Sequence, residues 1–210
     1  MTAVGKHLTS EANALLKALA KHVLLITAQA EDYCTKIGVE PTANLVTEKG
    51  FMTRINGVTT TKDAPPMVEE FADAMDELIK GDPNLFLNRK MAGYAVGHVG
   101  KDKPASWNKV LALMNQQAAS YAEVYLVEET AGFVDITMKS LSKATSLLEG
   151  MKHFPGHVSI ACGDSRNTDG PMLKVADMGI MVSNNLPNFA CVADHETMLQ
   201  VLAWFLTLLN

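Results

Sequence analysis

Two aspartates five residues apart, Asp164 and Asp169, form the part of this sequence most suited to chemistry. An apolar run at residues 157–162 precedes them, and a short helical segment (170–176) and a second apolar run (179–182) follow. A turn from a strand into a helix places its side chains at the carboxyl edge of a parallel sheet, where open α/β folds bind ligands. Carboxylate oxygens suit Mg²⁺. The turn is therefore a candidate magnesium site, with a plain polar turn as the alternative.

Composition limits the class of protein. The chain has 210 residues, of which 48% are hydrophobic and 20% charged, as expected for a globular protein with one sizeable domain or a core with an insert. The net charge of −5 argues against a nucleic-acid partner bound through a basic face. Cys34, Cys162 and Cys191 lie far apart without a CxxC pair, so we expect reduced thiols in the cytoplasm or another reducing compartment.

The most apolar stretch, residues 198–209, is too short to span a bilayer, so we expect no membrane span. We interpret it as a C-terminal helix packed on the sheet.

The hydrophobic pattern predicts two kinds of structure along the chain. Helix and strand alternate up to about residue 50 and again from about residue 139, which is typical of a parallel α/β sheet. Between them, period-two runs joined by turns, among them Asn56-Gly57, predict antiparallel hairpins with two helices. The predicted fold class is α/β, with a core from residues 1–50 and 139–210 and an α+β insert at 51–138.

This arrangement resembles the haloacid dehalogenase-like phosphatases with a large α/β cap, and most of all the trehalose-6-phosphate phosphatases. The strongest match is the acidic turn together with the motifs after it, Pro171-Met172-Leu173, Ala176-Asp177 and Gly179-Ile180. The resemblance implies a Rossmann-like parallel-sheet core with an inserted cap domain. It also implies phosphomonoester hydrolysis of a sugar phosphate with Mg²⁺.

The resemblance assigns roles to four residues of the core. Asp164 and Asp169 correspond to the family's metal ligands, Lys143 to its phosphate-binding lysine, and Thr27 to the Ser or Thr that holds the phosphoryl group. From the residues alone, each has a simpler explanation. Asp164 would cap the following helix, Lys143 would be a solvated lysine at a helix start, and Thr27 would end a strand.

In the cap region the resemblance assigns three substrate-binding residues. Glu48, in Glu48-Lys49-Gly50, resembles the turn where the family's chain passes into the cap. Lys90 lies where trehalose phosphatases carry a sugar-reading lysine, and Asp135 lies near their second cap acid. The alternative for Lys90 and Asp135 is that they are surface charges on strands.

The family's nucleophile has no counterpart in this sequence. The reaction uses an aspartate that forms an aspartyl-phosphate and a second aspartate as general acid and base, both in an Asp-x-Asp-Gly-Thr turn after the first strand. No such turn precedes the first predicted helix, where Glu11 is the only acid. Whether the chain is an enzyme is therefore open.

Other departures also concern the expected site. Ala28-Gln29 replaces the family's Gly-Arg, Asn88 replaces a cap Glu, and the acidic turn holds one extra residue. One added residue moves a side chain by about 3 Å, more than the ligand shell of Mg²⁺ tolerates. We therefore expect any Mg²⁺ binding to be weakened.

Two hypotheses account for these features. In the first, the chain is a degenerate sugar-phosphatase-like protein, non-catalytic, that serves as a binding, regulatory or structural subunit with a sugar phosphate or a protein partner. In the second, it is a Mg²⁺-dependent phosphatase of trehalose 6-phosphate or a similar sugar phosphate, whose N-terminal Asp-x-Asp strand is missing from this chain. The substitutions elsewhere favour the first. Because that strand is central in this fold, we expect residues 2–6 or a partner to occupy its place.

Overall fold

The structure is a computed structural model that describes residues 8–130, 132–183 and 190–209. The chain divides into two compact units, unit 1 with residues 1–61 and 142–210, and unit 2 with residues 62–141. Residues 51–61 were expected in the insert. They belong to unit 1 because the hairpin that they form continues its sheet.

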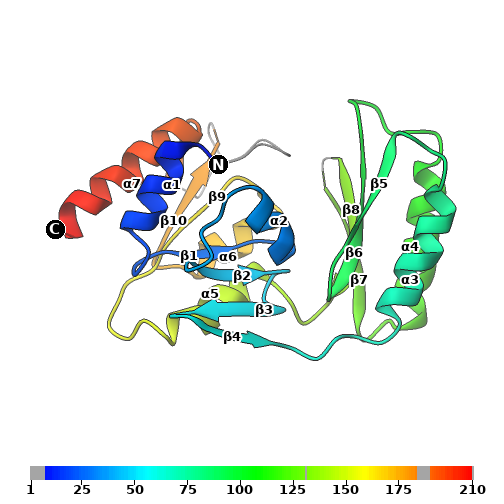
Figure 1. Cartoon of the computed structure of the whole chain (residues 1–210), viewed down its shortest axis with the longest axis horizontal. Helices are drawn as coiled ribbons and strands as arrows, with labels where there is room; N and C mark the ends of the chain where they lie inside the picture. Colours follow the sequence, from blue (N-terminus) through cyan, green and yellow to red (C-terminus); the bar gives the residue numbers. More distant parts are fainter. Residues whose placement is uncertain (1–7, 131, 184–189, 210) are drawn as a thin grey trace. The chain divides into compact units, whose positions relative to one another are not determined.

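Unit 1 has α/β architecture, which confirms the predicted fold class (Figure 1). Its helices and strands alternate for most of the sequence. In chain order they are α1 (Ser10–Ala18), β1 (Leu24–Ile26), α2 (Glu31–Lys36), β2 (Asn44–Thr47), β3 (Met52–Ile55), β4 (Val58–Thr61), α5 (Lys143–Met151), β9 (Ile160–Gly163), α6 (Gly170–Val175), β10 (Met178–Val182), β11 (Ala190–Val192) and α7 (His195–Leu209). The strand β11 was not predicted.

The strands of unit 1 form two sheets in the described residues. One has the order β1-β2-β3-β4, with β1 parallel to β2 and the other pairs antiparallel. The other has the order β11-β10-β9 and is entirely parallel. The predicted hairpin turn is confirmed, since Asn56 and Gly57 both have positive φ, +52° and +78°, as a two-residue hairpin loop requires. Residues 2–6, which were expected to occupy the place of the missing central strand, lie outside the described residues.

The C-terminal helix α7 packs on the sheet only through its first part. Met198 is buried against Ile180 and Val182 of β10. Further along, Trp204 and Leu208 are 57% and 61% exposed. In the part of the chain that the structure describes, no helix combines the length and the apolar character needed to cross a membrane.

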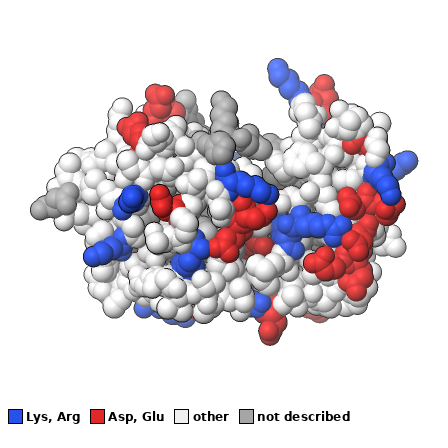
Figure 2. All heavy atoms as spheres, viewed as in Figure 1, with Lys and Arg blue, Asp and Glu red and all other residues white. Residues whose placement is uncertain are grey.

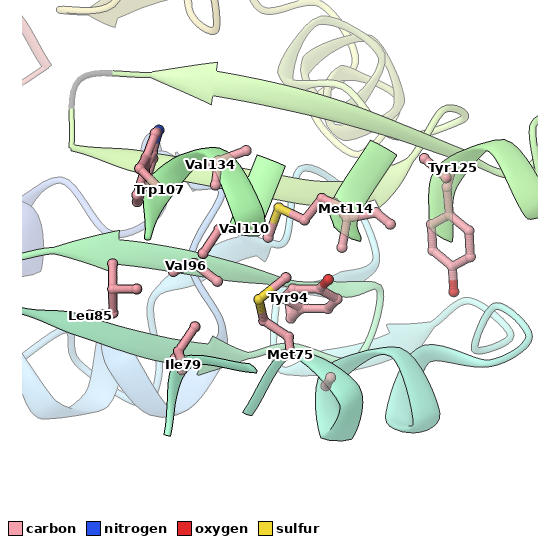
Figure 3. Packing of buried hydrophobic residues seen from close by; sticks show 13 residues of the cluster. Met75, Ile79, Leu85, Tyr94, Val96, Trp107, Val110, Met114, Tyr125 and Val134 are labelled. Atoms are coloured by element: carbon pink, nitrogen blue, oxygen red, sulfur yellow. The ribbon is translucent and has the colours of Figure 1, made fainter. Parts of the chain in front are cut away.

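Unit 2 is an antiparallel sheet with two helices on one face (Figure 1). Its elements are α3 (Val68–Ile79), β5 (Leu85–Arg89), β6 (Gly93–His98), α4 (Trp107–Ser120), β7 (Tyr125–Thr130) and β8 (Phe133–Met138), with the strand order β5-β6-β8-β7. Figure 3 shows the core between the helices and the sheet, where Met75 and Met114 lie close to the side chains of Tyr94 and Val96. The hydroxyl of Tyr94 donates to Gln117 of α4.

Charged side chains of unit 2 form a network on α3. Arg89 pairs with three acids of this helix, Glu69, Asp73 and Asp76. Figure 2 shows acidic side chains gathered over the part of unit 2 that carries α3, and basic side chains interspersed with acidic ones elsewhere on the face in view. Because these pairs are exposed, each contributes little to stability.

Two positions on α3 test the core of unit 2. Met75 is fully buried, whereas Leu78 on the same helix is 39% exposed. We expect Met75→Ala to lower the free energy of unfolding by roughly 2–5 kcal/mol, because it leaves a cavity. Leu78→Ala should cost less than about 1 kcal/mol. Denaturant unfolding of both variants measures this difference, and equal losses would contradict the assignment of the core.

The loops that lead into β9 and β10 are joined through Asp177. One carboxylate oxygen of Asp177 accepts from both the backbone N–H and the hydroxyl of Ser159, each at 2.8 Å. The backbone N–H of Asp177 donates back to the Ser159 hydroxyl at 3.0 Å. The backbone N–H of Ser159, followed by its hydroxyl, holds the pKa of Asp177 below its ordinary value.

This lowered pKa predicts a pH-dependent contribution to stability. A carboxylate with a depressed pKa stabilises the fold above its unfolded pKa of about 3.9, and this contribution is lost as the pH falls through the folded-state pKa. The melting temperature of the wild type should therefore exceed that of Asp177→Asn by a constant amount near neutral pH, and the difference should shrink below about pH 4. Asp63→Asn, at an exposed position, is the control. A difference that persists unchanged in acid would refute this role.

Candidate functional site at the carboxyl end of β9

Asp169 is held by backbone groups of its own turn. One of its carboxylate oxygens, Oδ2, accepts from the N–H groups of Asp164 at 3.0 Å and Ser165 at 2.9 Å. The turn is tight at this point, because a Cβ atom on Gly163 would lie 2.4 Å from the Cβ of Asp169. Glycine at the end of β9 therefore allows this carboxylate to lie against the strand.

The other carboxylate oxygen of Asp169 pairs with Lys143. Lys143 Nζ lies 2.5 Å from Asp169 Oδ1, and the two side chains are only 15% and 5% exposed. Lys143 is the first residue of α5, whose N-cap Ser142 accepts from the N–H of Thr145 at 3.0 Å. A cation at a helix N-terminus is electrostatically unfavourable, and Asp169 offsets this cost. The alternative of a solvated lysine is therefore wrong.

Asp164 does not make the same contacts as Asp169. Its side chain is 58% exposed, and Oδ2 lies 3.5 Å from Nε2 of His195, the first residue of α7. The N-cap of α6 is Asp169, which makes no side-chain capping bond because its oxygens are used elsewhere. The alternative of Asp164 as a helix cap is therefore also wrong.

Thr27 follows β1, at the carboxyl end of the neighbouring sheet. Its hydroxyl oxygen accepts from the N–H of Gln29 at 3.1 Å. Its carbonyl accepts from the N–H of Lys49 at 2.8 Å, and the carbonyl of Lys49 accepts from the hydroxyl of Ser146 at 2.7 Å. Ser146 lies in α5, three residues after Lys143. Hydrogen bonds thus connect Thr27 to the helix that carries Lys143.

Glu48 belongs to the turn that makes this connection. Glu48 and Lys49 have positive φ, +48° and +58°, and Gly50 has φ +113°. A Cβ on Gly50 would lie 2.6 Å from the hydroxyl oxygen of Ser146, so glycine allows the turn to approach α5. Glu48 itself is 2% exposed, and its N–H donates to the carbonyl of Gln29.

Lys90 and Asp135 form an ion pair with each other in unit 2. Lys90 directly follows β5, and Asp135 lies in β8 between Val134 and Ile136, which face the core under α3 and α4. Because side chains alternate along a strand, Asp135 is on the opposite face of the sheet. Their side chains are 7% and 14% exposed.

The thiol nearest to the acidic turn is a poor nucleophile. Cys162 precedes Gly163 in β9 and is half-buried. Desolvation by burial raises the pKa of this thiol to about 11. It is therefore protonated at neutral pH, and a thiol is far less reactive than a thiolate.

The donor set does not match a magnesium site built from the described residues. Both oxygens of Asp169 accept hydrogen bonds, one from Lys143 and one from two backbone N–H groups. Within residues 8–130, 132–183 and 190–209, no group of three or more His, Cys, Asp or Glu side chains is placed to hold a metal ion. Mg²⁺ needs oxygen ligands in nearly ideal octahedral geometry, which one exposed carboxylate at Asp164 does not provide.

In unit 1 the structure brings several of the predicted site residues together. Lys143 and Asp169 are in contact, and Asp164 is in the same turn. Thr27 and the turn that holds Glu48 are linked to α5 through Lys49, whose carbonyl accepts from the Ser146 hydroxyl. In unit 2, Lys90 and Asp135 pair with each other. Sequence reasoning missed His195, the neighbour of Asp164. The preceding strand β11 is a short, largely exposed Ala-Cys-Val run, which gave no pattern from which to place it.

Solved structures similar to this chain share its fold. A trehalose-6-phosphate phosphatase related protein has a TM-score of 0.79 at 15% identity, with 99% of this chain and 91% of that chain covered. The C-terminal domain of trehalose-6-phosphate phosphatase from C. albicans has a TM-score of 0.75 at 12% identity, covering 99% and 87%. A haloacid dehalogenase-like hydrolase from Bacteroides thetaiotaomicron has a TM-score of 0.65 at 13% identity, covering 97% and 95%.

Sequence comparison gives the family. A search of curated proteins finds no match. The sequence profile of the haloacid dehalogenase-like hydrolases matches residues 40–200, which is more than half of the chain and includes Lys143 and the acidic turn. This protein belongs to the haloacid dehalogenase-like hydrolases.

Proposed function

We propose that this protein binds a sugar phosphate without hydrolysing it, as a binding or regulatory subunit. The observation that carries the proposal is the Lys143–Asp169 pair at the carboxyl end of β9. A lysine ammonium has three N–H donors, and the bond to Asp169 uses one. The pair thus fixes the ammonium in place and leaves donors for phosphoryl oxygens, with which it makes strong charge-assisted bonds.

Thr27 supports the same role. Its hydroxyl oxygen accepts from Gln29, so the hydroxyl can still donate to a phosphoryl oxygen. Its position at the carboxyl end of a parallel strand is where ligands of open α/β sheets bind. In this proposal Lys143 supplies the charge and Thr27 a directed hydrogen bond.

The absence of hydrolysis is proposed from the roles of the described carboxylates. Phosphatases of this superfamily generally use Mg²⁺, and their nucleophile is a carboxylate. In this chain Asp169 serves as the partner of Lys143 and of two backbone N–H groups, and Asp164 lies beside His195. Losing a covalent nucleophile removes most of the catalysis in other enzymes, on the order of a millionfold.

We further propose that the ligand is a phosphorylated sugar because two similar structures are described as a trehalose-6-phosphate phosphatase or a protein related to one. The Lys90–Asp135 pair offers a donor and an acceptor side by side, which suits recognition of sugar hydroxyls. For Glu48 we propose a supporting role in the turn beside Thr27, because its side chain is buried.

The second candidate function is a Mg²⁺-dependent sugar phosphatase that acquires its nucleophile on a further strand. It is favoured by one observation: among the described residues, β1 and β9 each lack a strand neighbour on one side. In that case the acidic turn would join a site completed by the added strand.

Binding without turnover gives a direct prediction for Lys143. Calorimetric titration with trehalose 6-phosphate should show saturable binding, and Lys143→Met should weaken it about tenfold or more, because a charge-assisted bond is lost. Thr27→Val, which leaves the ion pair intact, should weaken it by a smaller factor. Lys174→Met, at an exposed lysine on α6, is the matched control and should bind like the wild type.

Turnover separates the two candidate functions. Phosphate release from trehalose 6-phosphate and from an aryl phosphate, with Mg²⁺ present, should stay at the rate without protein. Turnover that disappears in Asp164→Asn would overturn the proposal in favour of the phosphatase. Equal affinity for trehalose 6-phosphate in the wild type and Lys143→Met would remove Lys143 from the site.

A further inference from the structure

The outer face of the sheet in unit 2, opposite α3 and α4, carries two aromatic side chains. Side chains alternate along each strand. Val96 and Val134 belong to the core under the helices (Figure 3), so their neighbours Gly97 and Phe133 lie on the outer face. Phe86 of β5 is directly opposite Gly97, and Phe133 of β8 is opposite it on the other side. The three residues thus form one row across the sheet.

The two phenylalanine rings meet above Gly97. Their centroids are 5.5 Å apart, and the angle between the ring planes is 83°, an edge-to-face arrangement that aromatic pairs favour. A Cβ atom on Gly97 would lie 2.3 Å from Cζ of Phe86 and 2.7 Å from Cε1 of Phe133, so glycine is needed for both rings to lie over β6. Phe86 is nevertheless 40% exposed. We call Phe86 and Phe133 above Gly97 the aromatic platform.

The next row of the outer face is polar. Asn88 and Asp135 lie on either side of Ala95, and Glu128 of β7 is opposite Asp135. Because Ala95 has only a methyl group, the ion pair between Lys90, after β5, and Asp135 of β8 can cross β6 here. Residues two apart on a strand are separated by about 7 Å. The aromatic platform therefore lies directly beside a row of hydrogen-bonding groups.

This combination matches the amphipathic character of a pyranose sugar. The faces of a pyranose ring carry C–H groups, which are attracted by the negative face of an aromatic ring. Its hydroxyls project around the rim and both donate and accept hydrogen bonds. Lys90 and Asp135 offer a donor and an acceptor, and the bond between them uses one of the three ammonium donors and one acceptor site of the carboxylate.

A protein partner fits the outer face less well than a sugar. A phenylalanine side chain supplies about 150–250 Å² at most, so the aromatic platform falls short of the roughly 800 Å² that each partner of a standard protein interface buries. The platform also adjoins the charges of Lys90 and Asp135. Covering these charges is costly unless hydrogen bonds satisfy them, and a small ligand rich in hydroxyls provides such bonds.

We propose that the outer face of unit 2 binds a neutral pyranose ring, with a C–H face stacked on Phe86 and Phe133 and rim hydroxyls bonded to Lys90 and Asp135. This inference rests on the proposed function, which makes a phosphorylated sugar the ligand, and it names the groups that recognise the sugar ring. Stacking favours a sugar of the glucose type, whose hydroxyls are equatorial, because an axial hydroxyl on the stacked face would project into the aromatic platform.

The test measures how the full chain binds trehalose, a glucose disaccharide without phosphate, by NMR titration. Phe86→Leu and Phe133→Leu should each weaken trehalose binding about fivefold, because leucine keeps an apolar contact but has no aromatic face. Sorbitol, which has hydroxyls but no ring, should bind at least about fivefold more weakly than trehalose. Leu78→Ala, at a similarly exposed apolar position on α3, is the matched control and should bind trehalose like the wild type.

Inorganic phosphate separates this inference from the proposed function. Phosphate binding should weaken in Lys143→Met and stay unchanged in Phe86→Leu, whereas trehalose binding should show the reverse. If trehalose binding depends on Phe86 but neither phosphate nor trehalose 6-phosphate depends on Lys143, the inference is supported and the proposed function is overturned. The spectra of each titration also show whether the variant is folded, which we expect for a substitution at the exposed Phe86.

Three results would overturn the inference. In the first, the wild type does not bind trehalose. In the second, folded Phe86→Leu and Phe133→Leu bind trehalose as tightly as the wild type, while Lys143→Met still weakens the binding of trehalose 6-phosphate; the proposed function would then stand without the aromatic platform. In the third, sorbitol binds as tightly as trehalose, which would mean that hydroxyls alone are recognised.

Discussion

The pairing of the buried Asp169 carboxylate with Lys143 constrains the rest of unit 1. The two carboxylate oxygens of Asp169 accept from the Lys143 ammonium and from the backbone N–H groups of Asp164 and Ser165. These bonds join α5, the end of β9 and the start of α6. A buried carboxylate is costly unless it is paired and hydrogen-bonded, so the fold supplies all three donors. Gly163 leaves room for the carboxylate, because any larger residue would collide with Asp169.

This arrangement explains how a phosphatase-like loop can persist in a protein that we propose to be non-catalytic. Lys143 and Asp169, to which the resemblance assigns phosphate and metal binding, form a pair that positions an ammonium group at the carboxyl end of a parallel strand. The other acid of the turn, Asp164, lies beside His195. The described residues thus provide the contacts on which the proposed phosphate binding depends, but they provide no group of three or more side chains placed to hold a metal ion.

The sequence predicted the fold well because the signals were local. Hydrophobic alternation and turn residues such as Asn56-Gly57 identified the α/β core and its hairpin, and the acidic turn identified the family. Contacts between distant residues could not be predicted. The Lys143–Asp169 and Lys90–Asp135 pairs and the bond from Ser146 to Lys49 each join segments far apart in the chain. Their geometry follows only from the packed structure.

The central claim is that Asp169 binds Lys143 and backbone N–H groups rather than a metal ion. Its most direct test is the free energy of unfolding of Asp169→Ala and Asp164→Ala, each measured with and without Mg²⁺. Our account predicts that Asp169→Ala loses roughly 3–5 kcal/mol in both conditions, because it leaves Lys143 without its partner. Asp164→Ala should lose less than about 1 kcal/mol. Two results together would contradict the claim. Mg²⁺ would stabilise the wild type but not Asp169→Ala, and without Mg²⁺ the Asp169→Ala variant would lose little stability.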